Sequence, residues 1–209
     1  MDPQSLFSVE GKIVLITGGS RGIGKMMAHG FVMSKAKVYI SSRNAIDLEK
    51  AATELNALNQ GQVIAIPADL SKYEECERLK SEIEKRENKL HVLINNSGVT
   101  WGEDYDTYPD AAWDKVLTLN LKRVFTLTQM LTPLLECAAS KNDPARIIHI
   151  GSIDGIRTSG MHIFAYSASK HKAGLHHLSR NLAFHLGQRN ITSNTIACGP
   201  FQSKMMASI

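Results

Sequence analysis

The sequence predicts an α/β fold, a doubly wound parallel sheet in a single domain. Six short apolar runs rich in β-branched residues alternate with longer amphipathic stretches, which is typical of parallel strands joined by helices. Because the runs are almost continuously apolar, we expect helices on both faces of the sheet. Right-handed crossovers then bring the carboxyl ends of the strands, and the loops after them, to one edge. The runs cover residues 12–17, 38–41, 63–67, 91–95, 146–150 and 191–197.

Length and composition fit one domain. The chain has 209 residues, 43% hydrophobic and 21% charged, which suffices for a large core. The net charge of +4 comes from interspersed residues and argues against a nucleic-acid surface. Cys76, Cys137 and Cys198 are widely spaced, which favours neither a disulfide framework nor zinc. No apolar run nears the ~20 residues of a membrane helix, so we expect a cytoplasmic protein without membrane contact.

A glycine-rich loop follows the first predicted strand. The stretch TGGSRGIG, residues 17–24, contains a TGxxxGxG pattern between a strand and a helix. Glycines there permit a tight turn and a close approach of the backbone to a pyrophosphate, which the helix N-terminus stabilises through free N–H groups and its dipole. In this context the loop predicts a dinucleotide site. We expect cofactor contacts from Gly18, Ser20, Arg21, Gly22, Ile23 and Gly24.

Arg43 stands where the second predicted strand ends. Sites that prefer NAD usually place an acidic residue there, beside the ribose hydroxyls, but this chain has SSRN at 41–44. A guanidinium pairs in a bidentate way with a 2′-phosphate, and Arg21 can add a second positive contact. The two arginines therefore predict NADP(H) as the cofactor. The alternative is that Arg43 is a solvated loop residue.

Two further strand ends carry polar groups on the same edge, ADLS after the third strand and NNSG after the fourth. A carboxylate in the first position can accept a hydrogen bond from the adenine amino group, and the NNSG backbone can pass close to the adenine ribose. Structural roles remain open: Asp69 as a helix cap, and the asparagines as ties between strand ends. We expect cofactor contacts from Asp69, Leu70, Asn95, Asn96, Ser97 and Gly98.

Tyr166 and Lys170 lie four residues apart in the helical stretch AYSASKHKAG, residues 165–174. On a helix, residues at this spacing share a face and can reach the same bound molecule. A free phenol has a pKa of ~10, and a nearby cation favours the phenolate and lowers that pKa. We therefore expect Lys170 to lower the pKa of Tyr166. Tyr166 can then protonate a carbonyl oxygen while hydride reaches the carbon, or do the reverse.

Two polar residues complete the expected catalytic set. Ser152 follows the fifth strand, where its hydroxyl can hold a substrate oxygen beside Tyr166. Asn120 lies in an apolar helical stretch and can bind a water that relays protons toward Lys170, with some departure from regular helix geometry. Each residue also has a structural interpretation: a turn cap for Ser152, a satisfied buried amide for Asn120, and a partly buried aromatic for Tyr166.

Taken together, these residues resemble the short-chain dehydrogenase/reductase family. The glycine loop, NNSG, Asn120, Ser152 and Tyr166-x-x-x-Lys170 stand in the family's order and spacing over essentially the whole chain. The resemblance implies a Rossmann fold, catalysis by Asn120, Ser152, Tyr166 and Lys170, and hydride transfer between NADP(H) and a carbonyl or alcohol. It also implies that Lys170 hydrogen-bonds the nicotinamide ribose, so that Tyr166 and Lys170 both contact the cofactor.

Three stretches are similar to one branch of that family, the 3-oxoacyl-carrier-protein reductases of the rhamnolipid-biosynthesis type. They are residues 97–116, 142–156 and 196–205. The similarity implies a 3-oxoacyl thioester substrate, carried by acyl-carrier protein or coenzyme A, whose ketone is reduced to a secondary alcohol. Polyol and secondary-alcohol dehydrogenases share most of these motifs and remain an alternative. A nucleotide-binding product without turnover is another.

The chain departs from the family pattern at two places. Cys198 replaces the proline of a Pro-Gly pair, and we expect the following Gly199 to contact the cofactor. The chain also ends at Ile209, before the family's substrate-covering segment and last strand. We therefore expect residues 1–209 to be a single NADP(H)-binding Rossmann domain that lacks both. The resemblance implies a homodimer or homotetramer, with the helical stretches around 110–137 and 163–187 as one interface.

Four histidines lie on the second of these helical stretches: His171, His176, His177 and His185. A metal site needs ligands that converge, with support from neighbouring groups, and no acidic or cysteine partner stands at ligand spacing here. We expect no metal ion.

Overall fold

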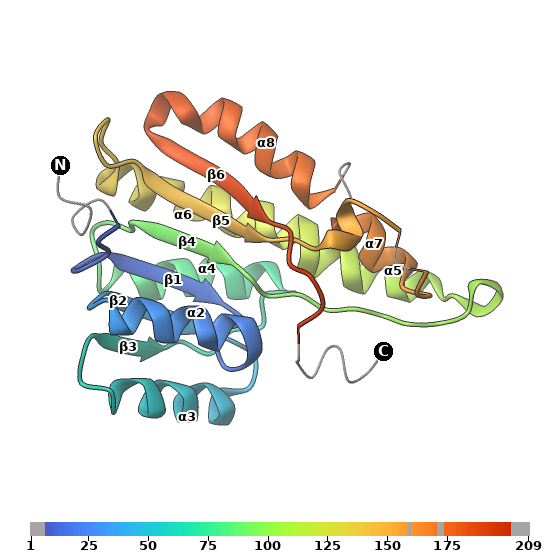
Figure 1. The fold of residues 1–209 in the computed structure, drawn as a ribbon, viewed down its shortest axis with the longest axis horizontal. Helices are drawn as coiled ribbons and strands as arrows, with labels where there is room; N and C mark the ends of the chain where they lie inside the picture. The colour runs from blue at the N-terminus through green and yellow to red at the C-terminus, as the bar shows by residue number, and fades with distance from the viewer. Residues whose placement is uncertain (1–6, 159, 171–173, 202–209) are drawn as a thin grey trace.

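The computed structural model describes residues 7–158, 160–170 and 174–201, which form one sheet with its connecting helices (Figure 1). The strands are β1 (Ile13–Thr17), β2 (Lys37–Ser41), β3 (Gln62–Ala65), β4 (Val92–Asn95), β5 (Ala145–Ile150) and β6 (Ile191–Ile196). All their pairings are parallel, in the order β3-β2-β1-β4-β5-β6. The predicted doubly wound parallel sheet is confirmed.

The strand order reverses between β1 and β4. β1 pairs with β2 on one side and with β4 on the other, and the chain crosses over between them. In such sheets the connections after these two strands diverge and leave a crevice that binds ligands. The glycine loop follows β1, and residues 95–98 follow β4. The predicted cofactor residues therefore meet at the ligand-binding position of the fold.

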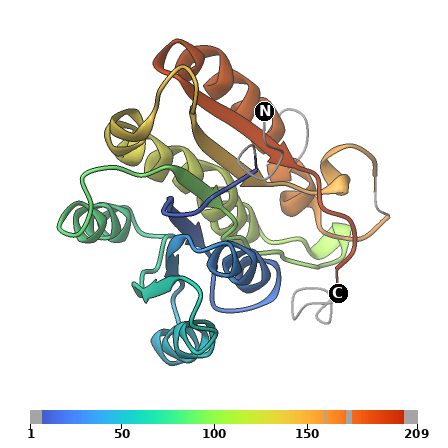
Figure 2. The ribbon, with the colours of Figure 1, turned by 60° about the vertical axis from the view of Figure 1, so that its left-hand side comes forward.

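Helices connect the strands on both sides of the sheet. In Figure 2 the sheet is seen nearer its edge, with α4 and α6 to the left of the strands and α2 to the right. The helices are α2 (Gly22–Met33), α3 (Ala45–Asn56), α4 (Tyr73–Glu84), α5 (Asp110–Leu117), α6 (Arg123–Ala138), α7 (Phe164–Lys170) and α8 (Leu175–Leu186). Short helical turns are η1 (Tyr105–Thr107), η2 (Thr118–Lys122), η3 (Ile153–Gly155) and η4 (Gly187–Arg189).

Two hydrophobic clusters cover the two faces of the sheet. Successive residues of a strand point to opposite faces, so β1 contributes to both clusters. Leu15 packs in the same cluster as Leu79 of α4 and Leu131 of α6. Val14 packs on the other side with Ala28 of α2. All five residues of β1 are buried, which explains why every residue before Thr17 is apolar.

β6 differs from β1 because one of its faces is exposed. Ile191 and Ser193 are buried, whereas Thr192 and Asn194 are exposed and Ile196 is 50% exposed. The covered face packs against α8. The prediction that the strands are buried on both faces is therefore wrong for β6. Its sequence, ITSNTI, has four consecutive polar residues between two isoleucines, and alternate residues of the strand are buried and exposed, as expected for a strand with one covered face.

The predicted helical stretch at 163–187 is not one helix. α7 ends at Lys170 and α8 begins at Leu175, after Gly174, whose φ of −97° and ψ of −122° are not helical. His171, one of the four histidines considered above, lies outside the described residues, as does the end of the chain at Ile209. Over 7–158, 160–170 and 174–201, no helix combines the length and apolar character needed to cross a membrane.

Candidate active site

Hydrogen bonds join the glycine loop to the residues after β4. The hydroxyl oxygen of Thr17 accepts from the backbone N–H groups of Asn96 and Ser97, both at 2.9 Å. The side-chain amide of Asn96 donates to the carbonyl oxygens of Thr17 (2.8 Å) and Gly18 (3.1 Å). The asparagine thus ties the two strand ends together. This fixes the shape of the crevice and leaves the outer face of the glycine loop for a ligand.

Two glycines of the loop are required by close packing. Gly18 has a φ of +69°, and a Cβ there would lie 2.7 Å from Nδ2 of Asn96. At Gly24 a Cβ would collide with the carbonyl oxygen of Gly18. The first turn of α2 can therefore pack backbone to backbone on the loop, as a pyrophosphate cradle requires. This turn contains no acidic residue, and no side chain caps it at Arg21, so nothing there opposes an anion.

A hollow of about 390 Å³ lies beside this turn. One wall is Ile23, Met26 and Met27 of α2, and the other is the segment 198–201 that follows β6. In Figure 1 that segment, drawn in red, descends beside the sheet toward the β1–α2 connection. Two predicted cofactor residues, Ile23 and Gly199, line this hollow. The structure thus brings the end of β6 to the glycine loop.

Arg21 and Arg43 are both exposed. Arg43 lies between the end of β2 and the start of α3, whose cap is Asn44, with its side chain accepting from the N–H of Asp47 at 3.1 Å. Arg43 is thus not used for capping. Both arginines belong to connections at the carboxyl edge of the sheet, Arg21 after β1 and Arg43 after the adjacent β2.

Asp69, Leu70 and Asn95 have structural contacts in addition to their position near the crevice. Asp69 accepts from the N–H (3.2 Å) and hydroxyl (2.8 Å) of Ser71, which forms a turn ahead of α4. Leu70 is a buried member of the core. The buried amide of Asn95 donates to the hydroxyl of Thr128 at 3.0 Å. The structural roles considered for these strand ends are therefore present in the fold. Asp69 forms an Asx-type turn, however, and does not cap α4.

Ser152, Tyr166 and Lys170 meet at the carboxyl end of β5. Ser152 precedes the short turn η3, and its hydroxyl forms a hydrogen bond with that of Tyr166 on α7. Lys170, one helical turn later, is buried and donates from Nζ to the carbonyl oxygen of Ile150 at 2.8 Å. Its Nζ lies 5.9 Å from the centre of the Tyr166 ring. The predicted serine, tyrosine and lysine therefore form one cluster.

The pKa of Tyr166 is shifted in the direction opposite to our expectation. Burial raises the pKa of Tyr166 above its ordinary value, the hydrogen bond from Ser152 opposes this, and the charges of Asp154 and Cys198 raise it further. Burial lowers the pKa of Lys170 to about 8. The spacing of the two residues correctly predicts a shared helix face, but desolvation of the phenol outweighs the ammonium group. In this structure Tyr166 therefore holds its proton.

Asn120 lies in η2, a π-helical turn between α5 and α6. Its side-chain oxygen accepts from the N–H of Val99 at 2.9 Å. Its amide donates to the carbonyl oxygen of Val99 (2.9 Å) and to the hydroxyl of Ser169 (3.1 Å). The predicted departure from regular helix geometry is confirmed. The amide joins η2 to the loop after β4 and to α7, while its role in holding a relay water stays a prediction.

Two residues at the site were not among the sequence candidates in these roles. Thr17 is the acceptor that closes the crevice, and its place in the glycine motif was a sufficient signal. Asp154 is a buried carboxylate two residues after Ser152. The available signal is an acidic residue two positions after the predicted catalytic serine, in GSIDGI.

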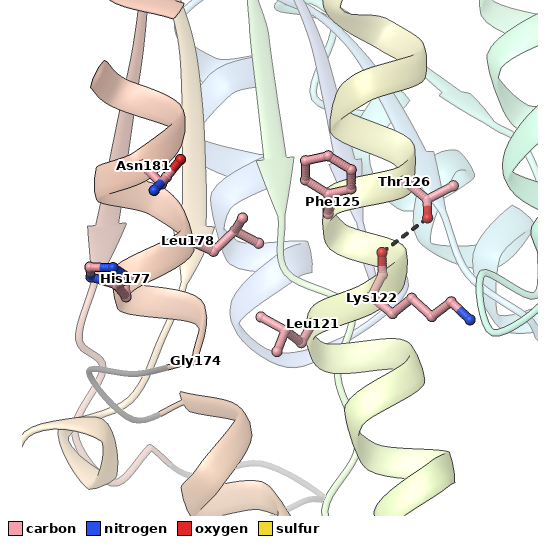
Figure 3. Close-up of a pocket in the computed structure, with 8 residues that line it drawn as sticks. All are labelled: Leu121, Lys122, Phe125, Thr126, Gly174, His177, Leu178 and Asn181. Atoms are coloured by element: carbon pink, nitrogen blue, oxygen red, sulfur yellow. Dashed lines mark hydrogen bonds between the residues drawn. The ribbon is translucent and has the colours of Figure 1, made fainter. Parts of the chain in front are cut away.

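A second hollow lies on the outer surface, away from this cluster (Figure 3). It has a volume of about 460 Å³ and runs between α6 with its preceding turn and α8. Figure 3 shows Phe125 and Leu121 facing Leu178 across it. Phe125 is 43% exposed, which is high for a phenylalanine. The lining residues are Leu121, Lys122, Phe125, Thr126, Gly174, His177, Leu178 and Asn181.

The fold and the cluster at its carboxyl edge are those of a Rossmann-fold oxidoreductase. Comparison with known proteins gives the family. The family model described as short chain dehydrogenase matches residues 12–209, and the chain belongs to this family.

Individual relatives fall in the same family. The chain is 44% identical over 203 residues to the rhamnolipids biosynthesis 3-oxoacyl-[acyl-carrier-protein] reductase of Pseudomonas aeruginosa, covering 97% of this chain and 78% of that protein. It is 31% identical to 5-keto-D-gluconate 5-reductase of Escherichia coli, covering 98% and 77%. Among solved structures, the RhlG/NADP active-site complex of Pseudomonas aeruginosa has a TM-score of 0.93 at 44% identity, covering 100% and 79%.

Proposed function

We propose that this chain is an NADP(H)-dependent reductase that converts the ketone of a 3-oxoacyl thioester to a secondary alcohol. The observation that carries the proposal is the hydrogen-bonded pair of Ser152 and Tyr166, with Lys170 one turn away, at the edge of the sheet that bears the glycine loop. The 44% identity to a 3-oxoacyl-[acyl-carrier-protein] reductase supports the substrate class.

The residues of the crevice fit NADP(H). The tight packing of Gly24 on Gly18 leaves room for a pyrophosphate, and the hollow between α2 and residues 198–201 continues that space. Arg43 and Arg21 supply the positive charge that a 2′-phosphate requires. An NADP complex of a solved relative supports the same assignment. When bound, NADPH supplies the hydride that reduces the carbonyl carbon.

Tyr166 acts as the general acid in this proposal. It donates its proton to the substrate oxygen, and the hydroxyl of Ser152 donates a hydrogen bond to the same oxygen and orients it. Because burial raises the pKa of Tyr166, the phenol carries its proton at neutral pH. Reduction therefore starts from the protonation state that the fold favours.

Lys170 and Asn120 support this proton transfer. With a pKa of about 8, Lys170 is mostly protonated at pH 7 and near its titration range, which suits a group that returns a proton to Tyr166. We also assign Lys170 the contact to the nicotinamide ribose. Its Nζ lies close to the loop after β4, since a Cβ at Gly98 would be 3.9 Å from it. Asn120 holds the loop after β4 against α7, and we assign it the water that links Lys170 to solvent.

We also propose that the chain associates with a second copy through the hollow between α6 and α8. An apolar surface with a half-exposed phenylalanine is typical of protein interfaces. Phe125→Asp is expected to shift the protein toward the monomer in analytical ultracentrifugation. Ile46→Asp, at an 82% exposed position on α3, serves as the control and leaves the assembly unchanged.

The test of the reductase proposal is NADPH oxidation with a short 3-oxoacyl thioester. Tyr166→Phe removes only the acidic hydroxyl and is expected to lower kcat by about 100-fold or more. Tyr73→Phe, which removes a hydroxyl on α4 outside the cluster, is the matched control and is expected to keep wild-type turnover. NADPH should raise the melting temperature of all three proteins.

Two other results would point elsewhere. Turnover with 5-keto sugar acids or polyols in place of the thioester would favour the polyol or secondary-alcohol dehydrogenase, which the 31% identity to 5-keto-D-gluconate 5-reductase keeps as the second candidate. Binding of NADPH without turnover on any carbonyl would make the chain a nucleotide-binding product.

The cofactor assignment has its own test. Arg43→Ala is expected to weaken NADPH binding by about tenfold or more, because a charge-assisted hydrogen bond is lost, and to leave NADH binding unchanged. Arg180→Ala, at an exposed position on α8, is the control. Equal loss of affinity for NADPH and NADH would contradict the 2′-phosphate contact.

A further inference from the structure

Asp154 is a buried carboxylate in η3, and the chemistry proposed above does not use it. It is only 6% exposed and lies in the turn that follows Ser152. Acidic residues are rarely buried to this extent unless they are paired or functional. Its surroundings therefore call for an explanation.

The contacts of Asp154 connect Ser152 to the residue that follows Tyr166. Its backbone N–H donates to the hydroxyl oxygen of Ser152 at 3.1 Å. One carboxylate oxygen, Oδ2, accepts from the hydroxyl of Ser167, the residue after Tyr166 on α7. The same turn packs directly on the end of α7, because a Cβ at Gly155 would collide with the carbonyl oxygen of Lys170. Asp154 thus lies between the serine turn and the tyrosine helix and bonds to both.

The second carboxylate oxygen has no such partner. Oδ1 of Asp154 is buried and has no hydrogen-bond partner within the described part of the chain. A buried carboxylate that is only half satisfied is destabilising, so a purely structural tie is better made by a neutral side chain. The negative charge is therefore the feature that needs a purpose. The carboxylate is bonded to the residue next to Tyr166, and its charge acts on the phenol.

We propose that Asp154 is a positioning residue that ties the Ser152 turn to the Tyr166 helix and, by its charge, keeps the proton on Tyr166. The inference rests on the proposed role of Tyr166 as the acid. A phenol that holds its proton is ready to protonate a carbonyl oxygen, so Asp154 extends the pH range of reduction upward. The reverse reaction needs the phenolate, which forms only at higher pH.

Other charged and titratable groups also face Tyr166. Lys170 on α7 lies 5.9 Å from the ring and favours the phenolate. Cys198, in the segment after β6, is kept as a neutral thiol at pH 7 because burial raises its pKa. The carboxylate of Asp154 is thus the group from η3 that opposes Lys170. Burial adds to its effect, since it raises the pKa of Tyr166 independently of Asp154.

Asp154→Asn tests the role of the charge. The amide oxygen can still accept from Ser167, and the backbone N–H to Ser152 is retained, so the tie remains while the charge is lost. The titration of Tyr166 is followed by phenolate absorbance in the cofactor-free protein, as the difference from the same protein with Tyr166→Phe. We expect the midpoint of Tyr166 to move to lower pH in Asp154→Asn. An unchanged midpoint would overturn the proposal.

Ser167→Ala is the matched control. It breaks the tie to α7 but keeps the carboxylate, so the midpoint should stay nearer to the wild-type value than that of Asp154→Asn. An equal shift in the two variants would mean that packing, and not charge, sets the titration. If Asp154→Asn does not fold, Asp154→Ser removes the same charge with a smaller side chain, and the same two outcomes apply.

The kinetic readout is the pH profile in both directions. In Asp154→Asn the basic limb of kcat/KM for reduction and the acidic limb of kcat/KM for oxidation of the alcohol should both move to lower pH. A uniform loss at all pH values would leave Asp154 with a structural role only. The absorbance titration needs no turnover, so it gives a result even if the proposed reductase activity is not found.

Discussion

β1, β2 and β3 form one half of the sheet, and helices lie on both of its faces. β5 and β6 form the other half, in which one face of β6 is exposed. The first half is built from apolar packing: Val14, Leu15, Val38 and Ile40 are all fully buried. The second half contains buried polar groups and the catalytic cluster. The packing of apolar side chains thus determines the form of the crevice that is expected to hold the cofactor. Hydrogen bonds position the catalytic residues beside it.

Buried hydrogen bonds cross the second half of the sheet. His149 of β5 is fully buried, with one ring nitrogen 3.3 Å from the amide of Asn95 and the other 3.2 Å from the hydroxyl of Ser193 on β6. Ser193 in turn lies 3.0 Å from the hydroxyl of Ser179 on α8. Polar side chains here take the place that aliphatic residues have in β1. Substitutions that change side-chain volume should therefore destabilise the first half most. Changes in the charge of side chains should destabilise the second half most.

The largest effect, a loss of cofactor binding, is expected at Gly24. In Gly24→Ala the new methyl group collides with the carbonyl oxygen of Gly18, so the loop must shift, at about 1–3 kcal/mol in unfolding free energy. NADPH binding should be lost at concentrations that saturate the wild type. Gly30→Ala, on the same helix with open space around it, is the control and should be neutral or slightly stabilising. Calorimetric titration measures the binding of NADPH to both variants. Retained binding in Gly24→Ala would contradict the proposal that the packing of Gly24 on Gly18 is needed for the cofactor site.

Leu15→Ala tests the apolar half through stability alone. The side chain is fully buried between strands and helices, so its truncation should lower the free energy of unfolding by about 3 kcal/mol. Urea unfolding followed by circular dichroism measures the change. A loss below about 1 kcal/mol would mean that this half is not the tightly packed one.

The polar half should respond to pH. Burial lowers the pKa of His149 to about 4, from 6.5 in the unfolded chain. Between these values the unfolded chain binds more protons, so the free energy of unfolding falls as the pH falls through that range. The loss due to His149 is about 2 kcal/mol between pH 7 and pH 5. Urea unfolding of wild type and His149→Asn at both pH values gives this contribution as a difference, and equal pH dependence in the two proteins would contradict it.

The smallest effect is expected at the exposed face of β6. Ile196 is half exposed, and Ile196→Thr should change the unfolding free energy by less than about 0.5 kcal/mol. The same urea experiment measures it beside Leu15→Ala. A loss comparable to that of Leu15→Ala would mean that this face of β6 is covered in solution and would remove the difference between the two halves.

Most of the fold was predictable because its signals are local. The apolar runs gave every strand within a residue or two, and the glycine loop between β1 and α2 gave the position of the crevice. The interval between α7 and α8 was not predictable, since the spacing of apolar residues continues through 163–187. The exposed face of β6 is signalled by the four polar residues Thr192–Thr195, which distinguish this strand from the continuously apolar ones.

The sequence predicted which residues lie together at the site, but not the direction in which the pKa of Tyr166 is shifted. Spacing placed Tyr166 and Lys170 on one helix face, yet the direction of the pKa shift of Tyr166 depends on how deeply the phenol is buried, which spacing does not contain. The contacts of Asn120 with Val99 and Ser169 likewise depend on three segments that meet only in the folded chain. The cytoplasmic location and the domain limits at 1–209 stay predictions.

The bonds between Thr17 and Asn96 have a consequence for the order of folding. They join residues 79 positions apart, so the crevice cannot close until the first four strands and the three helices among them have been made and brought together. Contacts over such distances form slowly, because the closure entropy of a long loop must be overcome first. A cofactor that binds only the closed crevice then stabilises the completed chain by mass action. Cellular cofactor levels would thereby set how much newly made chain survives proteolysis.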